Sequence, residues 1–190
     1  MFGFTQTKEL CDLAFSKKEN FSILKIFGDK IPNEFKIIDS TETWNPKTFY
    51  LEDINLADKN VMAEIEKDEH HPYHSAYLFS DKFLDYKVDE NEKIRLSKIA
   101  QNIKSKKIEI KERNYQIVKQ FKPKKGFYFL ITEPIYTGNG KFAFLEISIK
   151  KKDIFLGEKT DDYFGVLILM FEKTESGNWN QIGIKKHLIL

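Results

Sequence analysis

The sequence GFYFLITEPIYT (residues 126–137) is the first of four apolar runs that decide the fold of this chain. The other three runs are KFAFLEISIKKK (141–152), YFGVLILMFEK (163–173) and NWNQIGIKKHLIL (178–190). In the second run apolar side chains recur at every other position, which is the period of a β-strand with one buried face. Because short polar breaks separate the runs, the sequence predicts a C-terminal antiparallel meander.

The breaks between these runs differ in kind. The breaks TGNG (137–140) and SGN (176–178) contain Gly and Asn, which tolerate positive φ and therefore predict tight hairpin turns. The stretch 150–162 is longer and charged, and it predicts a mobile loop. Residues 166–171 are apolar on both faces, which predicts a central strand. Pro134 has no N–H to donate, which predicts an edge position or a bulge.

The rest of the chain mixes helix and strand signals. Asp89 and Glu92 form a capping-box pair, and an apolar stripe at helical spacing follows and ends at Ile103. Thr5 or Thr7 is expected to cap a first helix. Further helices are expected at 21–27 and 59–67, strands at 35–39 and 108–121, and a strand followed by a turn within 75–84.

These elements together predict an α+β fold. N-terminal and middle helices are expected to pack on a mainly antiparallel sheet of four to six strands that ends in the meander. A length of 190 residues suits a single domain over residues 1–190. Residues 1–74 are expected to form a helical or irregular part and residues 75–190 a helix plus the antiparallel sheet. Any domain boundary is expected near residues 66–74.

Charge and hydropathy limit which partners and which cellular location are expected for this chain. The chain has 31 basic and 29 acidic residues, so no global field steers it towards nucleic acid. No apolar run approaches the ~20 residues of a membrane-spanning helix. Residues 1–16 lack the pattern of a secretory leader. A cytoplasmic location is therefore expected for the chain as given, and a periplasmic or envelope location if a leader was removed.

A histidine cluster is the first candidate site. His70, His71 and His74 lie within five positions and Glu69 precedes them, and imidazole and carboxylate together suit zinc, copper or non-haem iron. The spacing matches no helical metal motif, and Pro72 interrupts the segment. We therefore favour an exposed polar loop and keep a divalent transition metal as the alternative, with no cofactor as the main expectation.

Aromatic residues of the meander are the second candidate site. If helices leave their side of the sheet partly uncovered, these rings are expected to line a pocket for a small apolar ligand. Core packing is the favoured alternative. The residues are Phe127, Phe129, Phe142, Phe144, Tyr163 and Trp179.

Two further chemistries are disfavoured. Lysine runs at 104–107, 122–125 and 150–152 suggest single-stranded nucleic acid, but acidic neighbours dilute them and the chain has only two arginines. Cys11 lies on the apolar face of the first helix, where a cysteine is a small hydrophobic residue rather than a nucleophile. The residues identify no catalytic set.

Residues 132–136, 140–143 and 173–179 are similar to the pattern "(S/T)-x-P-I-F … G-K-Y-A … K-K-x-x-G-x-W". Through this pattern the C-terminal part, about residues 126–185, resembles a family of uncharacterised bacterial envelope or lipoprotein-like domains. The cysteine that many relatives carry before the central strand has no counterpart here. The resemblance implies a non-enzymatic accessory protein and carries over no catalytic residue.

These observations favour a non-enzymatic bacterial binding or protein-interaction module. Its expected partner is another protein or a small apolar ligand, and an exposed edge of the sheet offers a surface for a homodimer. The alternative is a metal-binding protein or a metal-dependent hydrolase that uses His70, His71 and His74.

Overall fold

The computed structural model describes residues 3–26, 28–52, 54–108, 115–155 and 157–189, with the backbone alone for residues 3–6 and 155. The chain divides into two compact units. The first contains Met1–Thr43 and Lys104–Leu190, and the second contains Trp44–Ile103. The boundary expected near residues 66–74 does not coincide with this division, because it falls inside the second unit.

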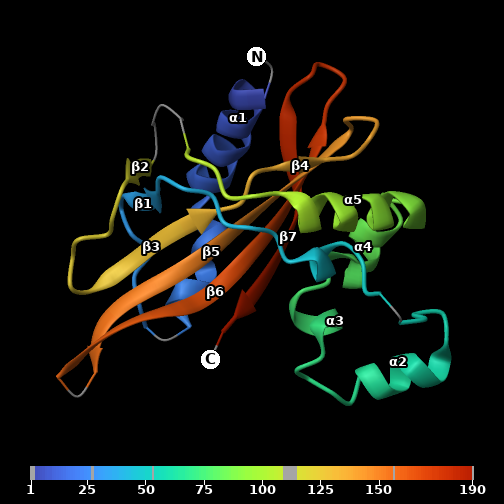
Figure 1. Cartoon of the computed structure of the whole chain (residues 1–190), viewed down its shortest axis with the longest axis horizontal. Coiled ribbons are helices and arrows are strands. Elements are labelled where there is room, and N and C mark those ends of the chain that lie inside the picture. The colour runs from blue at the N-terminus through green and yellow to red at the C-terminus, as the bar shows by residue number, and fades with distance from the viewer. Residues whose placement is uncertain (1–2, 27, 53, 109–114, 156, 190) are drawn as a thin grey trace. The chain divides into compact units, whose positions relative to one another are not determined.

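The first unit contains a sheet of seven strands, against the four to six expected. They are β1 (Phe35–Ile38), β2 (Tyr115–Val118), β3 (Gly126–Ile131), β4 (Ile135–Tyr136), β5 (Phe142–Phe155), β6 (Glu158–Lys173) and β7 (Trp179–Leu188). The order is β2-β1-β3-β5-β6-β7, with β4 also paired to β5. Strand β1 runs parallel to β2 and β3, and the other pairs are antiparallel. The α+β fold with a mainly antiparallel sheet is confirmed (Figure 1).

The meander is confirmed in detail. Gly140 and Gly177 have φ of 67° and 86°, and each lies in a predicted hairpin turn. Their N–H groups donate to the carbonyl oxygens of Thr137 and Thr174 at 2.8 and 2.9 Å, which closes the two turns. Strand β6 pairs with β5 and β7, as expected of a central strand. Pro134 lies in the break between β3 and β4, both of which pair with β5.

The mobile loop expected at residues 150–162 is wrong. Strands β5 and β6 extend through this charged stretch and pair as far as Phe155 opposite Glu158. Oppositely charged residues face each other across the two strands, Lys151 opposite Asp162 and Lys152 opposite Asp161. Such cross-strand pairs stabilise a hairpin whose two faces are polar, and hydrophobic periodicity does not detect them.

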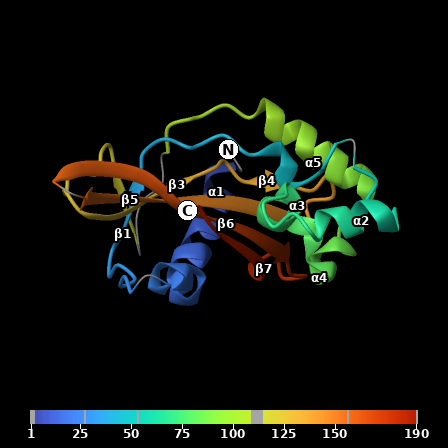
Figure 2. The same ribbon diagram turned by 90° about the horizontal axis from the view of Figure 1, so that it is seen from below.

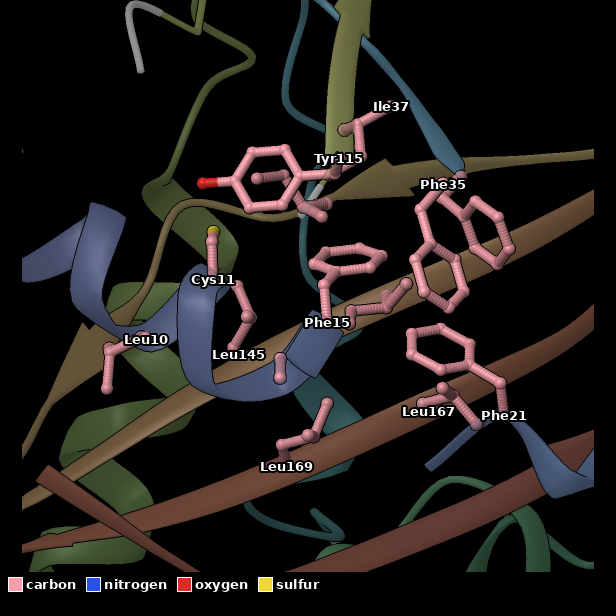
Figure 3. Packing of buried hydrophobic residues seen from close by; sticks show 14 of the residues in the cluster. Leu10, Cys11, Phe15, Phe21, Phe35, Ile37, Tyr115, Leu145, Leu167 and Leu169 are labelled. Carbon is pink, nitrogen blue, oxygen red and sulfur yellow. The ribbon is translucent and has the colours of Figure 1, made fainter. Parts of the chain in front are cut away.

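Helix α1 (Gly3–Ser16) and the 3₁₀ helix η1 (Lys18–Lys25) lie on one face of this sheet (Figure 2). Thr5 and Thr7 lie inside α1, so the expected caps are wrong, and the second helix is a 3₁₀ helix that begins three residues earlier than predicted. The rings of Phe15, Phe21 and Phe35 pack together with centroids 4.4–5.3 Å apart (Figure 3).

The side chains beneath α1 and η1 form the hydrophobic core of the first unit. From β5 it takes Ala143, Leu145, Ile147 and Ile149. These are the apolar positions of the alternation in the sequence, so that prediction is confirmed. Burial of side chains from both helices and from β1, β3, β5 and β6 holds α1 and η1 against the sheet.

The second unit consists of short helices. They are the 3₁₀ helices η2 (Pro46–Thr48) and η3 (Leu78–Ser80), and the α-helices α2 (Lys59–Ile65), α3 (Pro72–Ser75), α4 (Lys82–Asp85) and α5 (Glu90–Asn102). The predicted cap of α5 is confirmed, because the Glu92 N–H donates to Asp89 Oδ1 at 2.9 Å. In the described part of the chain, no helix is long and apolar enough to cross a membrane.

The strand expected at residues 75–84 is wrong. Its aromatic residues gave it the composition of a strand, but two local signals favour helix instead. Pro72 opens α3, and Asp81 Oδ1 accepts a hydrogen bond of 2.8 Å from the Phe83 N–H at the start of α4. A first-turn proline and an aspartate cap both stabilise helical backbone locally.

Candidate functional site

The prediction places five of the six aromatic candidates on one face, and they do not share it: Phe127, Phe129, Phe142, Phe144 and Tyr163. Phe129 of β3 pairs with Ile149 of β5, so its ring lies on the face covered by α1. Phe142 and Phe144 occupy the alternate positions of β5 and point to the opposite face. The prediction of one aromatic face is therefore wrong, because the pairing register between two strands cannot be read from either strand alone.

The other three aromatic residues have structural contacts of their own. Phe127 packs edge-on against Phe164 with centroids 5.0 Å apart. Trp179 is buried in the core beside Tyr136. Tyr163 is 45% exposed, and its hydroxyl donates to Glu42 Oε1 at 2.6 Å.

The histidine cluster does not converge on one point. Nδ1 of His71 accepts the Tyr73 N–H at 3.1 Å, which caps helix α3. Nε2 of His74 lies 2.9 Å from the carbonyl oxygen of Ile65, to which it donates. Glu69 and His70 are exposed. Among the described residues, no group of three His, Cys, Asp or Glu side chains could hold a metal ion, so the metal alternative gains no support from this geometry.

A cavity of about 790 Å³ lies within the second unit. Its apolar wall comes from the segment before α2 and from α2 itself: Leu51, Ile54, Leu56, Ala57 and Met62. Its aromatic wall consists of Tyr50, Tyr73, Tyr77 and Phe79. Its polar side chains are Asn55, Ser80, Lys82, Asp85, Glu90 and Lys93. None of the residues predicted as a site lines this cavity. Tyr73, which does line it, is the neighbour of His74 in α3.

The charged centre of this cavity is Lys93, on the first turns of α5. Its side chain is only 6% exposed, and its Nζ donates to Asp85 Oδ1. Glu90 Oε2 lies 3.6 Å from the same nitrogen, and the ring of Phe79 has its centroid 5.0 Å away. Carboxylates and a π face thus compensate the charge of a buried ammonium.

The aromatic wall also presents hydroxyl groups. Tyr77 is 3% exposed, and burial, with the nearby Asp85 carboxylate, raises its pKa above the ordinary value. Burial and Asp85 raise the pKa of Tyr73 in the same direction. Both phenols are therefore neutral at physiological pH. They combine apolar surface with a hydrogen-bonding group, which is what a ligand pocket requires.

A second cavity, of about 560 Å³, shares Tyr50, Leu51 and Ile54 with the first. It also contains His71 and Ser97, whose hydroxyl donates to the Pro46 carbonyl at 3.2 Å. These three residues therefore contribute to the walls of both cavities. Of the four residues predicted to bind metal, His71 alone lines this second cavity.

One sequence signal could have identified Lys93. The residues of α5 that are buried are Lys93, Leu96, Ser97 and Ala100, at the spacing of a single helical face. A lysine at such a position is buried only if an acidic or hydrogen-bonding partner compensates its charge. No comparable signal exists for the tyrosines, because Tyr73 comes from α3 and Tyr50 and Tyr77 from connecting segments, and they converge only in the folded chain.

None of the family models, curated proteins or solved structures compared with this chain matches it. The resemblance of residues 126–185 to a bacterial envelope family therefore stays a prediction. The candidate site rests on the geometry of the described residues that line the first cavity.

Proposed function

We propose that this chain is a binding module that takes a small organic ligand in the 790 Å³ cavity of its second unit. The cavity carries the proposal, because its volume falls in the range of roughly 300–1,000 Å³ that is usual for sites binding drug-sized ligands. Its composition agrees, with apolar and aromatic walls and a few polar groups that can orient a ligand. A protein partner and a bound metal stay predictions.

The chemistry of the described side chains supports binding rather than catalysis. Cys11 is the one cysteine of the sequence and is fully buried. Burial raises the pKa of its thiol to about 12, so very little of the nucleophilic thiolate forms at neutral pH. In the cavity, the Lys93–Asp85 pair offers charge and a hydrogen-bond donor.

Cavity filling tests this proposal. Ala57 lines the cavity, whereas Ala63 lies on α2, is exposed and does not line it. Ala57→Trp should occupy ligand space, and Ala63→Trp adds the same side chain to an exposed helix position as the matched control. A library of small organic molecules would be screened by ligand-observed NMR against both variants and the wild type.

We expect the wild type and Ala63→Trp to bind a common subset of the library, and Ala57→Trp to bind those molecules at least about tenfold more weakly, as loss of a few buried contacts implies. Equal binding by all three proteins would place the ligands elsewhere and contradict the proposal. Absence of binding to the wild type across the library would contradict it as well.

A further inference from the structure

The ammonium of Lys93 has more hydrogen-bonding capacity than its neighbours use. An ammonium carries three N–H donors. Among the described residues, Asp85 is its one hydrogen-bond acceptor, because Glu90 Oε2 at 3.6 Å is beyond hydrogen-bonding distance. The ring of Phe79 takes up one further side of the ammonium. Lys93 therefore lines the cavity with a buried donor that a ligand can use.

The cavity is lined by two lysines and two acidic residues, but these charges do not have equal effects. The side chains of Asp85 and Glu90 are 49% and 63% exposed, whereas that of Lys93 is 6% exposed. Water and salt screen the two carboxylates strongly and the buried ammonium weakly. Lys82 adds a second positive charge to the lining, but it is exposed and therefore screened like the two carboxylates. The weakly screened charge is the ammonium of Lys93, and at its unused N–H donors an anion is favoured over a cation.

The remaining wall selects an apolar ligand body. Leu51, Ile54, Leu56 and Met62 offer aliphatic surface, and the rings of Tyr50 and Tyr73 offer flat apolar surface. Burial of an aliphatic or aromatic group there stabilises a complex by roughly 25 cal/mol per Å² of apolar surface removed from water. An anionic ligand without such a body would gain nothing from these residues.

Resting on the proposed function, we infer that the ligand is a small carboxylic acid with an apolar body, whose carboxylate accepts a hydrogen bond from Lys93. The carboxylate competes for the ammonium with both acidic partners, the hydrogen-bonded Asp85 and the more distant Glu90. The carboxylate–ammonium contact in a buried site is charge-assisted and therefore stronger than a neutral hydrogen bond.

Three probes that share an unbranched eight-carbon chain separate this inference from the proposed function: octanoate, octanol and octylamine. Their affinities would be measured by NMR titration. Octanoate should bind about tenfold or more tightly than octanol, as one charge-assisted hydrogen bond implies. Octylamine should bind most weakly. Octanol binding as tightly as octanoate, or octylamine binding more tightly, would overturn the inference and leave the proposed function intact.

Variants assign the effect to Lys93. Lys93→Met keeps the buried stem and removes the charge, and Lys98→Met makes the same change at an exposed position of α5 outside the cavity lining. Lys93→Met should reduce octanoate affinity about tenfold without changing octanol affinity, whereas Lys98→Met should change neither. Unchanged octanoate binding by Lys93→Met would overturn the inference.

A second variant keeps the test decisive if Lys93→Met fails to fold. Asp85→Asn leaves Lys93 in place and removes the carboxylate that competes for it. Octanoate should therefore bind Asp85→Asn more tightly than the wild type. Weaker or unchanged binding would show that Lys93 does not act as the anion anchor.

Discussion

In the first unit, a hydrogen bond to Glu42 raises the pKa of the Tyr163 phenol. The Tyr163 hydroxyl donates to Glu42 Oε1 at 2.6 Å, and Lys150 Nζ lies 4.3 Å from the ring centroid. The hydrogen bond to Glu42, followed by burial, raises the pKa of Tyr163 from 10.0 to about 12. The folded state therefore favours the protonated phenol. Its contribution to stability is complete below about pH 10 and is lost as the pH rises through about 12.

The first prediction concerns this pair. Glu42→Gln removes the carboxylate that disfavours tyrosinate, so the pKa of Tyr163 should fall towards its ordinary value. Glu34→Gln, at an exposed position, is the matched control and should leave it unchanged. The measurement is a pH titration of the tyrosine ring carbon by NMR. A Tyr163 pKa that stays near 12 in Glu42→Gln would contradict the assigned cause.

Gly165 is required by space rather than by backbone conformation. A Cβ at this position would lie 2.7 Å from the carbonyl oxygen of His187 on β7 and 2.8 Å from Ile23 Cδ1. A side chain such as Ile23 can rotate away, but the carbonyl belongs to the paired strand. The position lies next to the register shift between β5 and β6 at Ile149 and Lys150.

The second prediction is that Gly165→Ala destabilises the chain by about 2 kcal/mol or more, the effect of overpacking a filled interior. Gly177→Ala is the control. Gly177 has a φ of 86° and open space around it, so a Cβ there meets no atom and costs about 1 kcal/mol through the left-handed backbone alone. Urea denaturation of both variants measures the difference. A smaller loss for Gly165→Ala than for Gly177→Ala would be inconsistent with the close approach.

At the scale of elements, the start of α5 depends on one capping side chain. Asp89 accepts the Glu92 N–H, and both Glu90 and Glu92 lie in the first turn, where negative charge is favourable. The same helix carries Lys93 into the cavity. The stability of its first turns therefore bears on the geometry of the candidate site.

The third prediction follows from this cap. Asp89→Ala should lower the free energy of unfolding by about 1 kcal/mol, as for other aspartate caps. Asn91→Ala, two positions later and exposed, should have little effect or stabilise slightly, because Ala has the higher helix propensity. Thermal and urea denaturation followed by circular dichroism measure both. Equal effects of the two substitutions would argue against the cap.

For the whole molecule, the chain path explains why the second unit interrupts the first. Thr41 and Lys106 are joined by two hydrogen bonds of 2.8 Å, from the Thr41 N–H to the Lys106 carbonyl and from the Lys106 N–H to Thr41 Oγ1. The chain therefore leaves the first unit and returns to it at neighbouring points. The segment 44–103 is an insertion between β1 and β2, which a boundary search based on composition does not detect.

Local patterns predicted the parts of the fold that depend on neighbours in sequence. The Gly and Asn residues of the breaks gave the turns, Asp89 gave the start of α5, and strict alternation gave the buried face of β5. The hairpin at 150–162 escaped prediction, because its stability comes from charges on one strand meeting charges on another. The aromatic residues were assigned to one face for the same reason, since register is a relation between strands.

The sequence by itself determined the α+β class, the C-terminal meander with its turns, and the buried state of Cys11, because each follows from periodicity, φ preference or apolarity within a short window. The tertiary structure alone decided the candidate site. Lys93, Asp85 and the cavity tyrosines come from separate helices and connecting segments, and their distances and their burial exist only after the chain has packed. Burial, in turn, is what shields the Lys93 ammonium from water and salt, and the proposed selection of an anionic ligand depends on that shielding.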